Sequence, residues 1–248
     1  MERHYTNGLS FLAGYTYSKA IDTNSSEFTT SRDQGFPQNS ANLAAEKGRS
    51  DFDFRHRLSL SYLYDLPVGS RVWRLHNPSL NYLIQSWGLA GVVTAQSGPP
   101  FTPQISGDVS GADEEAVIGT GNPTDRPNLT GSSFYPAHKT PNQWVLPSAF
   151  SAPAGTFGNA GRNILTGPGL SSWDFSLIRN FRFSESRSLE FRGEIFNLLN
   201  RANFDIPQRD VASSAFGQIT NTLRPVAGLA SGGPGDPREV QFGLRLMW

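Results

Sequence analysis

Cysteine is absent from the 248 residues, which excludes a disulfide scaffold, thiolate zinc sites and thiol catalysis. Excess charge is absent too, because 21 basic and 21 acidic side chains cancel, and no basic run favours a nucleic-acid partner. The longest uninterrupted apolar run, residues 89–93, contains Gly91 and is far shorter than the roughly 20 residues of a spanning helix. If this chain crosses a membrane, we expect it to cross as strands.

The N-terminal residues also lack the apolar core of a secretory signal, since Met1–Tyr5 leads directly into polar residues. Two interpretations stay open: either export depends on a segment outside this sequence, or the protein remains inside the cell.

What the sequence does contain is period-two alternation between Gly- and Pro-rich connections. In the first segment the odd positions are apolar or aromatic, and most even positions are small or polar. We predict a strand in each of six such segments, most of which have the about 9–11 residues of a tilted membrane strand. The predicted strands are residues 9–17, 58–66, 87–95, 173–183, 189–195 and 240–248.

Two positions depart from the predicted apolar faces. Gly193 lacks a side chain, and Arg179 would place a cation where the strand faces lipid. A cation at the bilayer midplane costs about 2–4 kcal/mol. We therefore expect Arg179 to lie near the lipid headgroups, or the register to slip there.

The connections between the predicted strands alternate in length. Residues 21–53, 98–172 and 200–238 form long connections, whereas 67–86 and 184–188 are shorter. Membrane barrels have long outer loops and short periplasmic turns, and a periplasmic C-terminus would put every long connection outside. Within the first turn, Asn77 or Ser79 could cap a short helix.

The opposite strand faces carry charges that a watery lumen tolerates and a dry core does not. We predict that five of these side chains face a lumen: Arg55, Arg57, Glu190, Arg192 and Glu194. Aromatic residues near the strand ends fit interfacial girdles. The predicted fold class is all-β, an antiparallel transmembrane β-barrel segment of about six strands with long extracellular loops.

Five stretches make the chain resemble a known family, the TonB-dependent receptors, and among these the Oar-like outer-membrane barrels. The stretches are residues 14–22, 53–58, 97–102, 158–169 and 191–200. The resemblance implies a complete barrel of about 22 strands with a plug in its lumen, and substrate uptake energised through TonB. It also implies a Gram-negative outer membrane as the location, with outer-membrane lipid, the rest of the barrel, the plug and the assembly machinery as partners.

The chain departs from that family because the regulatory-like N-terminal domain, the TonB-contacting segment and the plug are missing. Residues 1–248 therefore correspond to the C-terminal portion of such a barrel, and contact with TonB would run through the missing part. In this arrangement we expect the strand beginning at Leu9 to need a neighbour from outside the chain.

The last predicted strand resembles the C-terminal signal by which outer-membrane proteins are recognised for assembly. Its alternate residues are Val240, Phe242, Leu244, Leu246 and Trp248. Trp248 replaces the more usual terminal Phe, and an ordinary edge strand is the alternative interpretation.

No residue pattern indicates catalysis, a cofactor or a metal. The four histidines lie in different segments, without metal-ligand spacing. Asp51 with Asp53, or Asp113 with Glu114 and Glu115, could gather a cation, but solvated loop acids are far commoner. Besides the transport-related barrel, two hypotheses stay open: a secreted or surface β-sandwich that binds glycans, and an outer-membrane enzyme.

Overall fold

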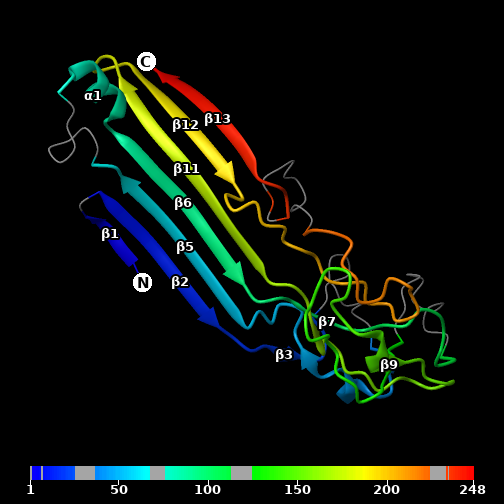
Figure 1. The fold of residues 1–248 in the computed structure, drawn as a ribbon. Helices are drawn as coiled ribbons and strands as arrows, with labels where there is room; N and C mark the ends of the chain where they lie inside the picture. The colour runs from blue at the N-terminus through cyan, green and yellow to red at the C-terminus, as the bar shows by residue number, and fades with distance from the viewer. Residues whose placement is uncertain are drawn as a thin grey trace.

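A single antiparallel sheet of seven strands dominates the computed structural model, which describes residues 2–6, 8–25, 37–67, 76–112, 125–223, 233 and 235–248. Neighbours in the sheet follow the order β1-β2-β5-β6-β11-β12-β13, and the sheet is open (Figure 1). The strands are β1 (Glu2–Thr6), β2 (Leu9–Tyr17), β5 (His56–Asp65), β6 (Trp87–Gln96), β11 (Leu170–Arg182), β12 (Ser188–Phe196) and β13 (Glu239–Met247).

All six predicted strands are confirmed, with ends displaced by three residues or fewer. The predicted count is wrong by one, because β1 pairs with β2 through Glu2↔Leu12 and Thr6↔Leu9. The expectation that β2 needs a neighbour from outside the chain is wrong for the same reason. Residues 2–6, with the sequence ERHYT, are too short and too polar to show an alternation.

One continuous register runs across the six longer strands. Opposite residues in antiparallel strands point to the same side, so each row of partners shares a face. One such row consists of Phe11, Tyr62, Gly91, Phe175, Ile195 and Val240. The side of the sheet that contains this row, here called the apolar face, carries every predicted apolar position that lies within these strands. The other side is the polar face.

Both glycines that interrupt the apolar face lie under aromatic rings. A Cβ atom on Gly91 would lie 2.5 Å from the ring of Tyr62, which covers that position from the neighbouring strand. Gly193 lies between the rings of Phe242 and Phe191, which stack with their centroids 6.1 Å apart. The apolar surface is therefore continuous across both glycines.

Arg179 keeps its place in the register, between Trp87 and Phe191, so the predicted slip does not occur. It is covered by the predicted short helix, α1 (Pro78–Ile84). The side chain of Asn77 accepts a hydrogen bond from the Leu80 amide at 3.3 Å, which confirms Asn77 as the capping residue. No helix in the described part of the chain is long and apolar enough to cross a membrane.

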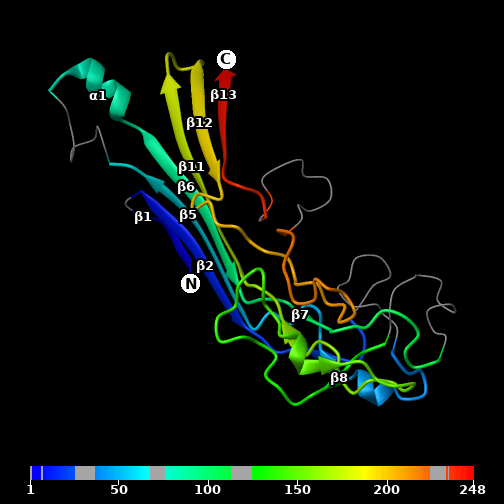
Figure 2. The same ribbon diagram turned by 45° about the vertical axis from the view of Figure 1, so that its right-hand side comes forward.

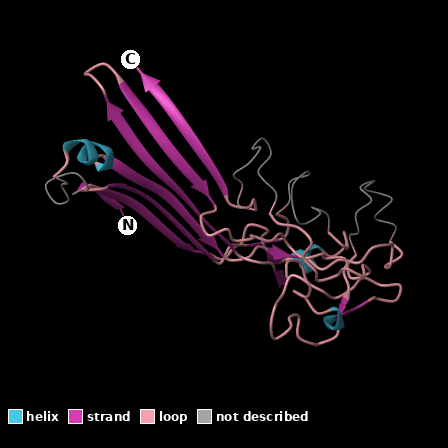
Figure 3. Cartoon of the chain, turned by 45° about the horizontal axis from the view of Figure 1, so that its top comes forward, coloured by secondary structure: helices cyan, strands magenta, loops and turns pink. Residues whose placement is uncertain are grey.

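The three long connections meet at one end of the sheet and fold together into a loop lobe, the described parts of residues 18–55, 97–169 and 197–238 (Figures 2 and 3). The described part of the connection 66–86 and the connection 183–187 lie at the opposite end with the C-terminus, here called the turn end. The lobe contains three small two-stranded antiparallel sheets that alternation could not reveal: β3 (Ile21–Asp22) with β4 (Gly48–Arg49), β7 (Pro100–Phe101) with β10 (Leu165–Thr166), and β8 (Asn128–Leu129) with β9 (Phe150–Ser151). It also has two short 3-10 helices, η1 (Leu43–Glu46) and η2 (Pro147–Ala149).

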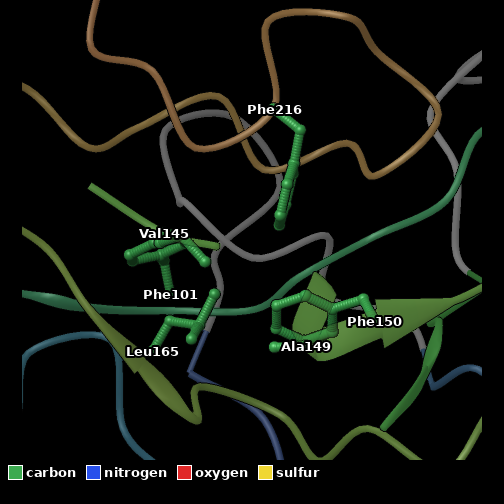
Figure 4. Packing of buried hydrophobic residues seen from close by; sticks show 6 residues of the cluster. All are labelled: Phe101, Val145, Ala149, Phe150, Leu165 and Phe216. Atoms are coloured by element: carbon green, nitrogen blue, oxygen red, sulfur yellow. The ribbon is translucent and has the colours of Figure 1, made fainter. Parts of the chain in front are cut away.

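The buried hydrophobic core lies in this lobe and not in the sheet (Figure 4). Phe101 and Leu165 are fully buried, and the ring of Phe150 packs edge-on against Phe216 with centroids 5.5 Å apart. The core consists of Phe101, Val145, Ala149, Phe150, Leu165 and Phe216. Loops that bury a core of their own have a defined shape instead of an ensemble of shapes.

Phe101→Ala should unfold the loop lobe selectively, because emptying a fully buried aromatic site costs about 3–5 kcal/mol. The expected result is rapid protease cleavage within residues 97–169 while the sheet stays resistant. Phe52→Ala is the matched control, since Phe52 lies in the same lobe but is exposed. Equal protease resistance of the two variants would contradict a packed lobe.

Candidate functional site

The polar face of β12 carries a row of alternating charges. The guanidinium of Arg192 lies 3.3 Å from the carboxylate of Glu190 and 3.7 Å from that of Glu194. The next strand places Arg245 opposite Glu190, and Gln241 opposite Glu194. The Arg192 side chain is 45% exposed, so these ion pairs contribute little to stability. They leave a hydrated, charged stripe on one side of the sheet.

The two other predicted lumen residues lie away from this stripe. Arg57 is on the polar face of β5, opposite Thr16 and Gln96 near the loop lobe, and two strands separate it from β12. Arg55 precedes β5, and its guanidinium lies 3.2 Å from the buried carboxylate of Asp53. The five predicted residues therefore form no single cluster.

An open depression of about 470 Å³ lies between these charges, mainly on the polar face of β2, β5, β6 and β11. Leu12, Leu63 and Val92 expose apolar surface there. The rest of the polar-face lining is Ser10, Ser61, Ala90, Asp174, Ser176 and Phe196. This mixture of apolar and hydroxyl groups suits contact with a ligand that has both characters.

Asp53 organises the base of the loop lobe. Its carboxylate accepts hydrogen bonds from the Arg49 Nε at 2.8 Å and from the Ala20 amide at 2.9 Å. Burial alone would raise the pKa of Asp53, but these hydrogen bonds and the charges of Arg49 and Arg55 bring it below its ordinary value. Asp53 is therefore held ionised as the common acceptor of Ala20, Arg49 and Arg55.

Arg162 joins the second long connection to the first. Its Nε donates to the Glu46 carbonyl at 2.9 Å, and its Nη2 donates to both the carbonyl and the carboxylate of Asp22. Burial would raise the pKa of Asp22, but hydrogen bonds from Ser25, Ser50 and Arg162 hold it below its ordinary value. The lobe is thus fastened by buried, hydrogen-bonded ion pairs.

A second buried pair lies beside the first, between Arg126 and Glu46. Gln38 bridges them. Its backbone amide donates a hydrogen bond to the Glu46 carboxylate, and its side-chain oxygen accepts one from the Arg126 backbone amide at 3.0 Å. Its side-chain nitrogen donates to the Gly158 carbonyl at 2.9 Å. A Cβ atom on Gly158 would lie 1.9 Å from the Arg126 carbonyl oxygen, so only glycine fits there.

Asn163 completes the junction in a left-handed backbone conformation, with φ of 56°. Its side-chain amide donates to the Arg49 carbonyl and to Asp51, both at 2.7 Å. Residues 158–163 are among the stretches that carry the family resemblance, yet the sequence assigned them no role. Their contacts with residues 38–51 show that they are a structural junction.

An aromatic cluster of partly buried side chains, which includes Tyr135 and Trp144, packs against the core of the lobe. The Tyr135 hydroxyl accepts a hydrogen bond from the Thr166 amide at 2.7 Å, and burial raises the pKa of that hydroxyl. The ammonium of Lys139 lies 3.6 Å above the Tyr135 ring and 5.3 Å from that of Trp144. Burial lowers the pKa of Lys139.

The predicted assembly residues Val240, Phe242, Leu244 and Leu246 lie on the apolar face of the edge strand β13, and Trp248 follows that strand at the turn end. All five side chains are more than half exposed. The described residues contain no cluster of three or more His, Asp or Glu side chains placed to hold a metal. Asp113, Glu114 and Glu115 lie outside the described residues.

A sheet with one continuous apolar face, a charged opposite face and long connections at one end defines the wall of a membrane β-barrel. A family comparison agrees with this class, because the model of the outer membrane beta barrel domain matches residues 1–241. The chain belongs to that family, and the protein is located in the outer membrane, within its lipid. Neither a curated protein nor a solved structure matches the chain.

Asp53→Asn should loosen the loop lobe in a pH-dependent way. At pH 6 the loss of a charged hydrogen-bond acceptor costs about 1–3 kcal/mol, seen as faster hydrogen exchange in residues 48–55. Because the folded pKa lies below the ordinary 3.8, the carboxylate's contribution is present above that value and is lost as the pH falls through the lowered pKa.

The wild type and Asp53→Asn should therefore converge as the pH falls through the lowered pKa of Asp53, once exchange is corrected for its intrinsic pH dependence. Asp108→Asn, which changes an exposed carboxylate of the same lobe, should match the wild type throughout. A difference for Asp53→Asn that stays constant as the pH falls through that lowered pKa would contradict the role of the ionised carboxylate.

Proposed function

We propose that this chain forms part of the barrel wall of a TonB-dependent receptor of the Oar-like group, which takes up a substrate across the outer membrane. The apolar face contacts lipid, the polar face lines a water-filled lumen, and the loop lobe meets the ligand outside the cell. The observation that carries the proposal is the single register that separates apolar from charged side chains across the long strands.

Charge supports this orientation of the faces. Glu190, Arg192, Glu194 and Arg245 share the polar face, and exposing four charged groups to hydrocarbon would cost several kcal/mol each at the midplane. Within the six longer strands, the apolar face carries one Lys, Arg, Asp or Glu side chain, that of Arg179, which helix α1 covers. Lipid therefore fits one face and water the other.

Connection length supports the proposed direction. Long outer loops and short periplasmic turns are usual in outer-membrane barrels, which puts the loop lobe outside and the C-terminus in the periplasm. The core and buried ion pairs give the lobe a fixed surface, and a fixed surface loses less entropy when it binds a ligand.

The open sheet supports a barrel of more than seven strands. Among the described residues, no strand pairs with the outer edge of β1 or of β13. Unpaired backbone groups in hydrocarbon cost several kcal/mol each, so both edges need neighbours. We propose that further strands of a barrel of about 22 supply them, that a plug fills the lumen, and that TonB acts through that part.

The single sheet argues against the glycan-binding sandwich, because a sandwich buries one face of each sheet under the other. Here the described chain leaves both faces of the long strands largely uncovered. Our proposal assigns the chain no catalytic role. The assembly machinery, reading β13 and Trp248, is the further partner that the proposal includes.

Single cysteines test the two faces in outer membranes from cells that make the protein. Cysteines at Phe175, Phe191 and Leu244 should react with a membrane-confined reagent, since these positions share the apolar face. Cysteines at Ser176, Arg192 and Arg245 should react with a water-soluble reagent. Residues 1–248 contain no cysteine, so each substitution introduces the one thiol of this part of the protein. The opposite labelling pattern would overturn the proposal.

Deleting Trp248 should impair assembly more than the finished fold. Trp248 is 88% exposed, so its loss removes little packing within the chain. We expect the truncated protein to accumulate unassembled in the periplasm, as measured by fractionation and protease sensitivity. Trp248→Phe is the matched control and should assemble normally, since Phe keeps a terminal aromatic. Wild-type amounts of the deletion variant in outer membranes would refute the assembly role.

A further inference from the structure

Helix α1 docks against the outside of the wall. The Tyr82 hydroxyl donates a hydrogen bond to the Arg182 carbonyl at 3.2 Å, and the Tyr82 ring lies 6.4 Å from that of Phe181. Figures 1 and 3 place α1 beside the turn ends of the strands. Phe181 is on the apolar face, so the helix lies on the side of the sheet that the proposed function gives to lipid.

Arg179 fastens the helix to the sheet. Its guanidinium donates to the Tyr82 carbonyl and lies 4.0 Å from the centre of the Phe181 ring, with the Trp87 ring at 5.3 Å. The side chain is almost fully buried, and its Nε has no hydrogen-bond partner. A cation so enclosed needs the carbonyl and the aromatic rings that surround it. The cation therefore holds the helix on the sheet, and the helix supplies a carbonyl that the buried cation needs.

Helix α1 carries no charged residue and exposes apolar side chains. Leu80 is 51% exposed and Tyr82 39% exposed, and residues 76–86 contain no Asp, Glu, Lys or Arg. The neighbouring turn, residues 183–187, carries Glu185 and Arg187, as a turn in water commonly does. Residues 76–86 thus differ in charge from the turn 183–187 at the same end of the sheet. Arg71 and Arg74, earlier in the same connection, lie outside the described residues.

We propose that α1 is an interfacial anchor, which lies in the headgroup region of the periplasmic leaflet and presents Leu80 to the boundary of the acyl chains. Its partner is the phospholipid of that leaflet. The anchor rests on the proposed assignment of the apolar face to lipid.

Continuity with the apolar face favours lipid over a protein partner. Tyr82 of α1 packs against Phe181, and Arg179 contacts the rings of both Tyr82 and Trp87, so one apolar surface extends from the strands onto the helix. Tyr and Trp rings are favoured at the headgroup level, where one edge is apolar and the other hydrated. An uncharged helix with aromatic neighbours fits this zone, and it shields Arg179 from the acyl chains.

The test uses the full-length protein, extracted from outer membranes and reconstituted in vesicles of phosphatidylethanolamine and phosphatidylglycerol. A fluorophore is attached to a single cysteine at Leu80, at Glu185 or at Leu244. Iodide then quenches probes in water, and phospholipid with a nitroxide near its headgroup quenches probes at the interface. We expect the Leu80 probe to be quenched severalfold more by the nitroxide lipid, and severalfold less by iodide, than the Glu185 probe.

If iodide quenches the Leu80 probe as strongly as it quenches the Glu185 probe, the anchor proposal is overturned. Protection of the Leu80 probe from both quenchers would also overturn it, because a protein partner or second copy would then cover the helix. The Leu244 probe reports separately on the proposed face assignment: strong iodide quenching there would refute that assignment, whatever the Leu80 probe shows.

Arg179→Gln tests the attachment of the helix. Without the guanidinium, the Leu80 probe should shift towards the quenching pattern of the Glu185 probe, whereas Arg182→Gln on the polar face of the same strand should leave it unchanged. Tyr82→Phe is the milder variant, since it removes only the hydrogen bond to the Arg182 carbonyl, and it should shift the pattern less. If the Arg179→Gln variant assembles and its Leu80 probe keeps the wild-type quenching pattern, the role of Arg179 is refuted.

Discussion

The whole structure depends on the uninterrupted register of β2, β5, β6, β11, β12 and β13. Antiparallel pairing gives each strand the face assignment of its neighbour, so a slip of one residue would turn a strand's apolar side chains to the charged side. Gly91, Gly193 and Arg179 interrupt the row of apolar side chains on this face without a shift of the register, and each is covered by a neighbouring group. Tyr62 covers Gly91, Phe242 covers Gly193, and α1 covers Arg179.

The same register determines where the connections meet. Because the strands alternate in direction, every long connection leaves the same end of the sheet, and the three can pack on one another. Their packing relies on a small aromatic core and on buried arginine–carboxylate pairs. Such pairs cost desolvation energy, so they contribute less to total stability than to the choice of one conformation. A loop lobe with one conformation can present a defined surface.

The sequence predicted the six long strands, their faces and the capped helix because a two-residue period and a cap are local signals. It could not reveal β1, which is too short to show a period. The contacts of Arg162 with Asp22 and Glu46 were equally hidden, since they join residues more than 100 positions apart. The ion pair of Arg55 with Asp53 joins near neighbours, yet it too was hidden, because alternation does not reveal that Asp53 is buried.

The central claim is that the two faces of the sheet lie in different solvents. Spin labels placed singly along residues 170–182 of β11 test it most directly, through collisions with oxygen, which concentrates in lipid, and with a water-soluble nickel complex. We predict two oscillations of period two that are out of phase, with oxygen peaks at Trp173, Phe175, Leu177 and Phe181 and nickel peaks at the even positions. Arg179 is left unsubstituted, because it fastens α1 to the sheet. Oscillations in phase, or none, would contradict it.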